Sequence, residues 1–469
     1  MNIGRILKSM LAKLESKGIA LHTKEGVPIL PSIVQGKRLY SEYTIPVETP
    51  IDNSLIISYQ SPYAGPERVW DPKPYSNLAP TEAVSEELLD ALEGELAELE
   101  DALVDAIVLD TGKTLHEARL EMELTLRLLR RIPATRSNKA STASLVSMPS
   151  FTMPLYTTVH SIVEAYRMES GILVKPPRKA PIVPTLLAQV LSTAGYSRNV
   201  SLVQAPGAFI HGVARAYNLP VAAYASPMKS RFIGDRVYAP GRYALIVEKG
   251  LISEDLAKLV VYSRVLHAGQ ACGSIGWIVI LGGLPERSEL EALFSVVEKV
   301  KVGDPLDSNT TMGPLVSSHA ANASESYTSH LEEIGGSVIT GFRRYGNYVW
   351  PTIVQGSMKD PGVLSRDPKF PVLSIIKSGN LAEALSVVTL TPSTGVILFG
   401  LNSSEAARAV TSLQGRHIYL EPDLKGIDLT PGSFTTRDCI NLNLYDAKVQ
   451  IGGNPLVGLK GPSEAEPYR

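Results

Sequence analysis

From residue 171 onward, short runs of aliphatic residues alternate with stretches in which apolar residues recur every three or four positions. The short runs predict strands and the longer stretches predict helices. The predicted strands are 171–175, 200–203, 243–247, 277–281 and 396–399, and the predicted helices are 181–194, 253–266, 286–300 and 404–414. Strands that alternate with helices are joined by crossover connections, which give mostly parallel sheets with helices on both faces. The sequence therefore predicts an α/β fold.

The part of the chain before residue 171 has two different patterns. Residues 24–80 are rich in Pro, Tyr and Ser and contain short β-branched pieces such as 55–59, which predict strands and loops. From Pro80 to about Arg131, leucines recur at helical spacing, with one interruption at 110–113. With 469 residues, the chain is long enough to form two or three hydrophobic cores.

Charge and hydropathy argue against two classes of partner. Lys and Arg number 45 and Asp and Glu number 47, which gives a net charge of -2 and no global field to attract nucleic acid or an acidic membrane. No apolar run reaches the roughly eighteen residues that a membrane-spanning helix needs. Residues 1–14 lack the continuous apolar stretch of a signal peptide. We expect neither a nucleic-acid partner nor a membrane partner.

The two cysteines indicate the redox setting and one candidate nucleophile. Cys272 and Cys439 lie far apart, outside any CxxC or Cys/His cluster, so we expect no disulfide scaffold, no metal site and a reducing, cytoplasmic setting. Cys272 follows a predicted helix and precedes a predicted strand, a turn that can present a side chain to a cleft. A cysteine suits acyl chemistry because its thiolate is nucleophilic near neutral pH. The alternative is a buried, inert cysteine.

Several segments give this cysteine a context. They run in one order along most of the chain from residue 80 onward, at 109–119, 301–307, 312–315, 351–354, 370–373 and 452–453. Together they resemble the aldehyde dehydrogenase superfamily, and the segment Lys-Val-Gly-Asp-Pro-Leu-Asp at 301–307 is the most specific of them. The resemblance implies a Rossmann-type cofactor-binding domain from 1–133 and 152–245, and a catalytic domain from 246–438. It also implies a shortened linker or oligomerisation hairpin at 134–151 and a C-terminal return segment at 439–469.

The resemblance assigns catalytic roles one residue at a time. Cys272 matches the cysteine that attacks the aldehyde carbonyl. Thr152 stands where the family has the Asn that stabilises the oxyanion, and the loss of one such donor commonly costs about 2.7–4 kcal/mol of transition-state stabilisation. Tyr238 stands where the family has its general-base Glu, and a phenol loses its proton only near about pH 10. The resemblance thus preserves the nucleophile but leaves hydrolysis of the acyl-enzyme without its usual base.

The resemblance also implies an NADP or NAD site. Lys175 matches a lysine that contacts the adenosine ribose, and Arg178, with Lys179 beside it, replaces a carboxylate typical of NAD-preferring members, which favours NADP. The alternative is that Arg178 and Lys179 form a solvated loop. Asp367 stands where the family has a Glu that holds the nicotinamide ribose. Between 225 and 242 too few residues remain for the helix whose N-terminus faces the pyrophosphate.

His267 precedes Cys272 by five residues, where the family usually has Asn. It is either a surrogate base or thiolate partner for Cys272, or a packing or capping residue at the helix end. A spacing of five on a helix separates the two side chains by about 140°, so a hydrogen bond between them requires the helix to end before Cys272. Cys439 is expected to be a small buried hydrophobe.

Three functions follow from these observations. The first is an NAD(P)-dependent aldehyde dehydrogenase or acyl-transferring reductase, which acts on a small-molecule aldehyde through a thioester on Cys272. The loss of the base suits transfer of the acyl group to a thiol such as coenzyme A better than transfer to water. The second is a catalytically degraded relative that acts as a structural or regulatory partner. The third is a cofactor-free thiol acyl hydrolase or transferase that uses Cys272 and His267. We expect a homodimer, and no residue cluster identifies the aldehyde.

Overall fold

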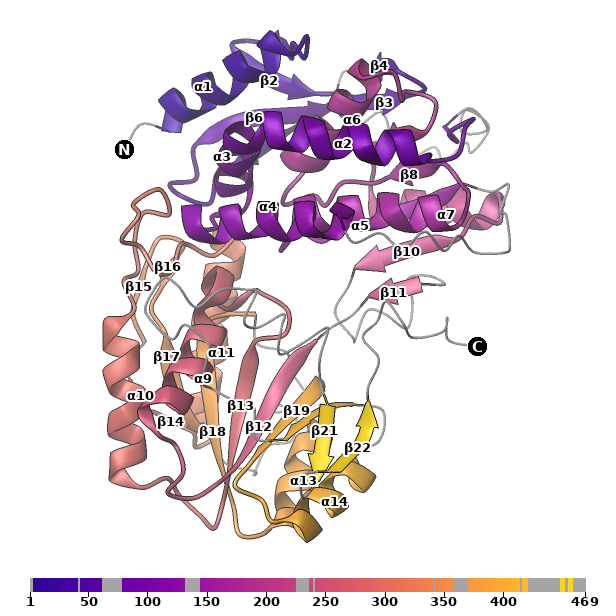
Figure 1. Cartoon of the computed structure of the whole chain (residues 1–469). Coiled ribbons are helices and arrows are strands. Elements are labelled where there is room, and N and C mark those ends of the chain that lie inside the picture. Colours follow the sequence, from indigo (N-terminus) through magenta and orange to yellow (C-terminus); the bar gives the residue numbers. More distant parts are fainter. Residues whose placement is uncertain are drawn as a thin grey trace. The chain divides into compact units, whose positions relative to one another are not determined.

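The computed structural model describes residues 3–40, 43–60, 78–130, 144–224, 236–238, 241–340, 342–356, 369–413, 416–420, 448–451 and 454–458. The chain forms two compact units, Met1–Ala239 and Pro240–Arg469. Each sheet has all of its strands within one unit. Figure 1 shows the helices packed against the sheet faces within each unit.

The first unit is built around a seven-stranded sheet with the order β11-β10-β7-β8-β9-β3-β4. Its strands are β3 (Ser32–Val34), β4 (Lys37–Leu39), β7 (Leu145–Met148), β8 (Ile172–Val174), β9 (Val200–Leu202), β10 (Val221–Tyr224) and β11 (Arg236–Tyr238). Strands β7 to β11 pair in parallel, and β3 pairs antiparallel with both β9 and β4. A smaller sheet has the order β1-β2-β6-β5. Its strands are β1 (His22–Lys24), β2 (Val27–Leu30), β5 (Thr44–Glu48) and β6 (Leu55–Gln60).

The connections of the larger sheet create a point where the strand order reverses. The chain steps from β7 to β8 to β9 in one direction, and then returns past β7 to form β10 on its other side. In open α/β sheets, ligands bind outside the carboxyl ends of the strands at such a point. The carboxyl ends of β7 and β10 are therefore the place in this unit where the topology favours a ligand site.

Helices cover the sheet and supply local anchoring. They are α1 (Ile3–Ser16), α2 (Glu86–Glu98), α3 (Glu100–Thr111), α4 (Leu115–Arg130), α5 (Pro154–Arg167), α6 (Ile182–Thr193) and α7 (Gly207–Ala216). Asp110, at the end of α3, is buried and accepts a hydrogen bond from the backbone N–H of Ile182 at 2.8 Å, so it caps α6 from another helix. Burial raises the pKa of Asp110 well above its usual value.

The second unit also has a seven-stranded sheet, with the order β14-β17-β18-β13-β12-β19-β20. Its strands are β12 (Arg242–Glu248), β13 (Ile275–Leu281), β14 (Ser337–Val338), β17 (Thr352–Gly356), β18 (Val372–Ser378), β19 (Ser393–Phe399) and β20 (His417–Leu420). Only β14 pairs antiparallel among these described strands. Two hairpins accompany the sheet: β15 (Arg344–Tyr345) with β16 (Tyr348–Val349), and β21 (Lys448–Ile451) with β22 (Asn454–Gly458).

Both faces of this second sheet are buried, which explains the continuous aliphatic runs in its strands. Along β12, Leu245 and Val247 join one core, whereas Ala244 and Ile246 join the other. The helices are α9 (Glu254–Val265), α10 (Arg287–Lys299), α11 (Ser318–Glu333), α13 (Leu381–Leu390) and α14 (Ser403–Ser412). Helices α9, α10 and α11 contribute to the first core, and α13 and α14 contribute to the second.

The predicted α/β class is confirmed, with mixed but mostly parallel sheets. The structure differs from the expected domain limits in two places. Strand β12 pairs with β13 and β19, so the boundary between the units falls at 239/240 instead of 245/246. Residues 145–148, placed in the expected linker at 134–151, form β7 inside the first sheet, because β7 pairs with both β8 and β10. Residues 134–143 of that linker lie outside the described residues.

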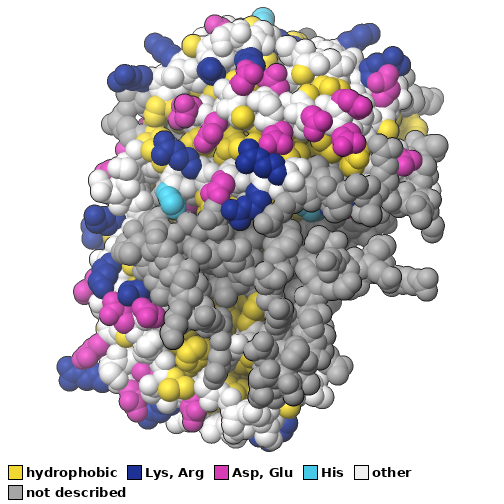
Figure 2. All heavy atoms as spheres, viewed as in Figure 1, with side chains coloured by type: hydrophobic (Ala, Val, Ile, Leu, Met, Phe, Trp, Pro, Cys, Tyr) yellow, Lys and Arg dark blue, Asp and Glu magenta, His cyan; other side chains and the backbone are white. Residues whose placement is uncertain are grey.

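Two surface properties of the described residues bear on partners. None of their helices combines the length and apolar character that crossing a membrane requires. Figure 2 shows Lys and Arg side chains interspersed with Asp and Glu over the visible face of each unit.

Candidate active site

Cys272 lies at the amino ends of the parallel strands in the second unit. It sits three residues before β13, beside the start of β12, and its side chain is exposed. The backbone N–H of Gly273 donates to the carbonyl of Gly241 at 2.8 Å, and the N–H of Ile275 donates to Ser263 Oγ at 2.9 Å. These bonds fix the two sides of the turn, so the thiol is presented to solvent from a defined backbone.

The backbone before Cys272 adopts an uncommon left-handed turn. Helix α9 ends at Val265, and the next residues include His267 (φ 48°, ψ 46°) and Ala268 (φ 52°, ψ 40°), both in the left-handed region. Residues other than glycine occupy this region at a cost of roughly 1–2 kcal/mol each. Such strain persists only where surrounding contacts hold the backbone in place.

Gly269 completes the left-handed turn, and two separate reasons require a glycine at this position. Its φ is +78°, and a Cβ at this position would lie 2.2 Å from the carbonyl carbon of Phe370. The turn therefore packs directly on the backbone that precedes β18.

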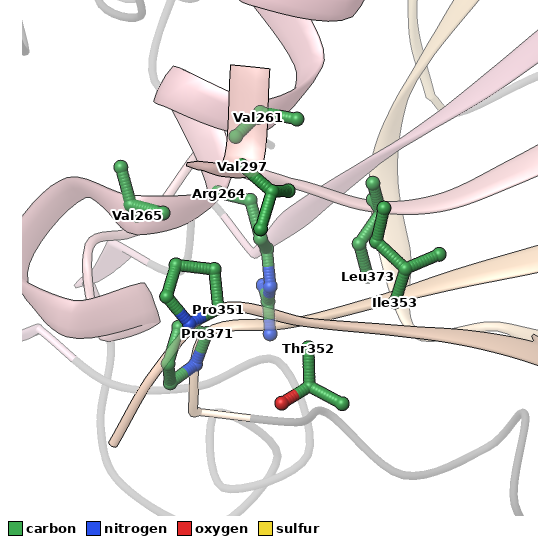
Figure 3. Close-up of a pocket in the computed structure, with 9 residues that line it drawn as sticks. All are labelled: Val261, Arg264, Val265, Val297, Pro351, Thr352, Ile353, Pro371 and Leu373. Atoms are coloured by element: carbon green, nitrogen blue, oxygen red, sulfur yellow. The ribbon is translucent and has the colours of Figure 1, made fainter. Parts of the chain in front are cut away.

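Polar side chains hold the turn from several sides. Arg242 donates to the carbonyls of Gly269, at 2.9 Å, and Ala271. Arg264 donates to the carbonyl of Phe370 and, at 3.3 Å, to Ser274 Oγ. Figure 3 shows Arg264 extending toward the starts of β17 and β18, beside a small cavity that is lined by Val261, Val265, Val297, Pro351, Thr352, Ile353, Pro371 and Leu373.

Gln270 adds a link to a more distant segment. Its Nε2 donates to the carbonyl of His267 at 3.0 Å, and its Oε1 accepts from the N–H of Val316 at 3.2 Å. Gln270 is buried, so these bonds are shielded from water. Val316 directly follows the segment 312–315, one of those that carried the family resemblance. Gln270 thus connects the turn to the end of that segment.

The structure places His267 and Cys272 in different environments. The helix ends before His267, which meets the condition for the two side chains to approach each other. His267 is nevertheless buried, with 2% of its surface exposed, whereas Cys272 is exposed. This arrangement favours the packing interpretation of His267.

The candidate oxyanion residue lies in the first unit, directly after β7. Thr152 is buried, and its Oγ1 is 2.8 Å from Ser150 Oγ, with either atom able to donate. The N–H of Ser150 donates to Thr157 Oγ1 at 3.0 Å, and this hydroxyl donates to the carbonyl of Met153. The Thr152 segment is therefore folded back on the first turn of α5, at the strand reversal described above.

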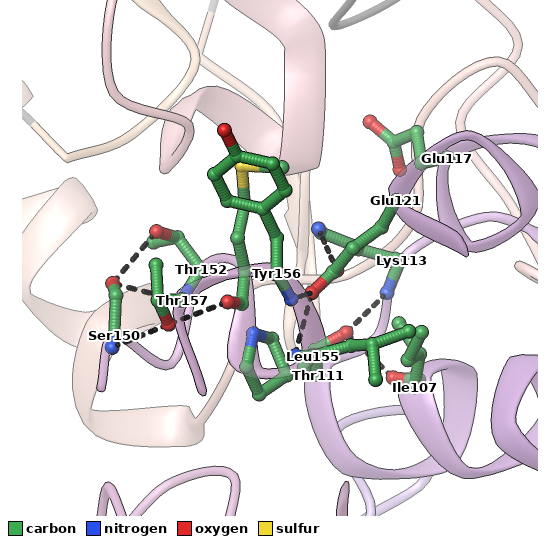
Figure 4. Close-up of polar contacts among 12 residues, drawn as sticks. Ile107, Thr111, Lys113, Glu117, Glu121, Ser150, Thr152, Leu155, Tyr156 and Thr157 are labelled. Atoms are coloured by element: carbon green, nitrogen blue, oxygen red, sulfur yellow. Dashed lines mark hydrogen bonds and ion pairs between the residues drawn. The ribbon is translucent and has the colours of Figure 1, made fainter. Parts of the chain in front are cut away.

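A buried ion pair anchors the start of α5 (Figure 4). Lys113 Nζ lies 2.6 Å from Glu121 Oε2, and these side chains are 4% and 1% exposed. The other oxygen of Glu121 accepts hydrogen bonds from the N–H groups of Leu155 at 2.8 Å and Tyr156 at 3.2 Å. A carboxylate at the N-terminus of a helix is stabilised by the helix dipole. Glu121 thus fixes the helix that follows the Thr152 segment.

The candidate cofactor residues lie at the carboxyl end of β8. Lys175 follows β8 and is half-buried, whereas Arg178 is exposed. Burial, with a smaller effect from the charge of Arg178, lowers the pKa of Lys175 to about 8. The charge of Lys175 also helps to lower the pKa of His211 on α7, after burial and Arg215. This group of cations fits an anionic ligand, because a bound phosphate would offset their mutual repulsion.

The sequence did not reveal a second polar pair at the strand reversal. His160 Nδ1, on α5, lies 2.5 Å from the hydroxyl of Tyr224 at the carboxyl end of β10. Burial lowers the pKa of His160. The i, i+4 spacing of Tyr156 and His160 on α5 was the available sequence signal, because it places both rings on one helix face.

Several expected site residues lie outside the described residues. Asp367 and Cys439 are among them, as is the segment 225–235, where the phosphate-facing helix was expected to be missing. Tyr238 ends β11, and its side chain is likewise outside the description. Among the residues that the structure does describe, no group of three or more His, Cys, Asp or Glu side chains could hold a metal ion.

Comparisons with known proteins agree with this fold. A model of the aldehyde dehydrogenase family matches residues 237–418. The lactaldehyde dehydrogenase of Methanococcus maripaludis is 25% identical over 349 residues, which cover 66% of this chain and 72% of that protein. The solved 1-pyrroline-5-carboxylate dehydrogenase of Thermus thermophilus has a TM-score of 0.72 at 17% identity, with 94% of each chain covered. The NADP-dependent glyceraldehyde-3-phosphate dehydrogenase of Bacillus halodurans, complexed with NADP, has a TM-score of 0.71 at 17% identity, with 83% of this chain and 90% of that chain covered.

Proposed function

The chain is a member of the aldehyde dehydrogenase superfamily, and from this premise we propose that it oxidises a small-molecule aldehyde through a covalent intermediate on Cys272. The observation that carries the proposal is the exposed Cys272 thiol on a turn that is fixed at the amino ends of β12 and β13. A nucleophile that is exposed on a rigid backbone can meet a substrate without reorganisation of the turn.

The residues of this chain account for the first step. The Cys272 thiolate forms a C–S bond to the aldehyde carbon, and the carbonyl π electrons move to the oxygen, which gives a thiohemiacetal oxyanion. The donor role of Thr152 rests on the family resemblance alone, and its hydroxyl, which is now bonded to Ser150, keeps a proton that a stronger acceptor could take up. When the oxyanion collapses, a thioester remains on Cys272 and a hydride leaves the carbon. A nicotinamide cofactor, when bound, supplies the acceptor for this hydride.

We propose NADP as the preferred cofactor and NAD as the alternative. Lys175 and Arg178 would hold the adenosine ribose and its 2′-phosphate, because both cations lie at the carboxyl end of a parallel strand.

The thioester is proposed to pass to a thiol. Tyr238 stands where the family has a carboxylate base, and a phenol does not deprotonate water near neutral pH because its own pKa is about 10. A thiol acceptor such as coenzyme A needs less activation than water, since roughly a few per cent of a thiol is already ionised near pH 7 and the thiolate is a strong nucleophile.

One observation supports the second candidate, a catalytically degraded relative that serves as a structural or regulatory partner. The Thr152 hydroxyl is engaged with Ser150 inside its own segment, and a threonine side chain is shorter than the asparagine that it replaces. The cofactor-free hydrolase has weaker support, because His267 is buried whereas Cys272 is exposed.

Calorimetry with NADP and with NAD, beside alkylation of Cys272, tests the proposal. We expect micromolar binding of NADP. We also expect alkylation of the wild type at Cys272 and no alkylation of Cys272→Ser, in which Cys439 is the one remaining cysteine. Such a result leads to turnover assays with lactaldehyde, the substrate that names the Methanococcus maripaludis relative, in the presence and absence of coenzyme A. No binding of either dinucleotide at millimolar concentration would refute the dehydrogenase proposal and leave the second candidate. The homodimer and the cytoplasmic setting stay predictions from the sequence.

A further inference from the structure

Two buried arginines converge on the turn that carries Cys272. Arg242 is the first residue of β12, and Arg264 lies in the last turn of α9, so their guanidinium groups reach the turn from two different elements. Their exposed fractions are only 2% and 1%. Both donate to the hydroxyl of Ser274, which is fully buried and lies two residues after Cys272. One hydroxyl therefore links both cations to the turn.

These arginines also hold backbone carbonyls on the amino side of Cys272 and in the segment that precedes β18. Arg242 binds the carbonyls of Gly269 and Ala271, and Arg264 binds that of Phe370. A guanidinium suits this arrangement because its planar fork fixes several acceptors at once, which an ammonium does not. The left-handed His267 and Ala268 lie between α9 and the carbonyls that Arg242 holds.

Burying a cation is costly, and a neutral side chain of similar size would fill the same space at lower cost. We infer that Arg242 and Arg264 are positioning residues, which hold the strained turn in the one backbone geometry that presents the Cys272 thiol. The inference rests on the proposed function, in which Cys272 is the nucleophile. It assigns the arginines no contact with substrate or cofactor.

Hydrogen exchange tests this inference whether or not a substrate is known. The variants are Arg242→Met and Arg264→Met, with Arg242→Lys and Arg264→Lys as conservative partners. Arg416→Met is the matched control, because Arg416 also binds carbonyls and a serine hydroxyl in this unit, at Val388, Thr391 and Ser393, away from the Cys272 turn. The readout is exchange in the peptide 266–275, in which the N–H groups of Gln270, Gly273 and Ile275 are hydrogen-bonded.

We expect exchange in this peptide to rise at least about tenfold in both methionine variants, to rise less in the lysine variants, and to stay unchanged in Arg416→Met. Exchange within 276–281 of β13 should not change in any of them. Wild-type protection of 266–275 in the methionine variants would overturn the inference. If either methionine variant fails to fold, Ser274→Ala removes the shared hydroxyl and leaves both arginines in place. The same rise is expected there, and unchanged protection would overturn the inference equally.

Kinetics separates positioning from general stability and from the proposed function itself. With an active aldehyde, kcat should fall about 100-fold in the methionine variants with KM nearly unchanged, and the lysine variants should recover part of the loss. Unchanged kcat would overturn the positioning role. If the wild type turns over no aldehyde, the proposed function fails, and the exchange measurement still decides whether the arginines hold the turn.

Discussion

The ammonium of Lys113 lies 2.6 Å from the carboxylate of Glu121, and both side chains are buried. Glu121 also accepts two N–H groups at the start of α5, so one carboxylate joins an ion pair to a helix terminus. We predict that Glu121→Gln lowers the free energy of unfolding by about 3–5 kcal/mol, because an amide cannot serve the buried ammonium and the helix donors together. Urea unfolding followed by circular dichroism measures the change.

Two further variants calibrate this prediction. Lys113→Met should cost less than Glu121→Gln, because the carboxylate keeps its N–H donors at α5. Arg287→Ala breaks an exposed pair with Glu291 and should change stability by less than about 0.5 kcal/mol. If Glu121→Gln proved as mild as Arg287→Ala, the ion pair would not stabilise this part of the fold.

Gly269→Ala should destabilise the Cys272 turn by about 3 kcal/mol or more, because a left-handed φ and a clash with Phe370 add together. Gly346→Ala is the matched control. Gly346 also has a positive φ, of +58°, but no atom within 4 Å of an added Cβ, so only the conformational cost applies. Thermal unfolding compares the two variants, and equal losses would contradict the proposed contact with Phe370.

His267→Asn should leave the alkylation rate of Cys272 within about twofold of the wild type. Asparagine tolerates the left-handed φ of 48° at this position, so the turn is retained while the imidazole is removed. Iodoacetamide labelling followed by mass spectrometry gives the rate. A tenfold decrease would instead identify His267 as a partner of the thiolate.

Asp105 should make the stability depend on pH in the acidic range. Burial, with a smaller contribution from Asp101, raises the pKa of Asp105 to about 6 from its usual 3.8, and Arg119 opposes the shift. Between these two pKa values the folded state binds more protons than the unfolded state. The contribution of Asp105 to the free energy of unfolding therefore falls as pH rises from about 4 to about 6. In the wild type this fall in the free energy of unfolding should amount to about 1–3 kcal/mol, and it should be absent in Asp105→Asn.

Urea unfolding of the wild type and Asp105→Asn at pH 4.5, 5.5 and 6.5 tests this dependence. Asp101→Asn should reduce the slope, since it removes the neighbouring negative charge. Parallel pH profiles for the wild type and Asp105→Asn would show that Asp105 does not carry the effect.

Arg178→Ala should weaken NADP binding about 10- to 100-fold and leave NAD binding nearly unchanged, because only NADP offers a 2′-phosphate. Lys179→Ala, at the adjacent exposed position, should have a smaller effect. Lys175 adds a pH signature. Its pKa of about 8 means that it loses its charge above this pH, so NADP affinity should decline from pH 7 to pH 9 in the wild type but not in Lys175→Met. Equal losses of NADP and NAD in Arg178→Ala would argue against a 2′-phosphate contact.

The parts of the fold that depend on local pattern were predictable. The aliphatic runs at 243–247 and 277–281 became β12 and β13, because strands buried on both faces of a parallel sheet have no polar alternation. The helix expected from Pro80 is less regular. It starts at Glu86 and breaks between α2 and α3 at Leu99, where the backbone leaves helical geometry although the leucine spacing continues.

The parts that depend on long-range contacts were not predictable. Nothing near His267 and Ala268 indicates a left-handed backbone, since the contacts that hold it come from Arg242, Gln270 and Phe370. The sequence placed Cys272 at a turn that can present it to a cleft, with a buried, inert cysteine as the alternative. It gave no role to Arg264, whose acceptor at Phe370 is more than a hundred positions away. The ring pair of His160 and Tyr224 was missed for the same reason.

The division of the chain at 239/240 has a consequence for inheritance and engineering. Because the chain crosses from one unit to the other once, a gene split at this junction would separate no hydrogen-bonded pair among the strands that the structure describes. The half that contains Cys272 and its two arginines could then be exchanged between relatives as one piece. The half that contains Lys175 and Arg178 could be exchanged as another. Substitutions in one half need not disturb the other, so the proposed nucleotide site and the Cys272 turn can diverge at different rates.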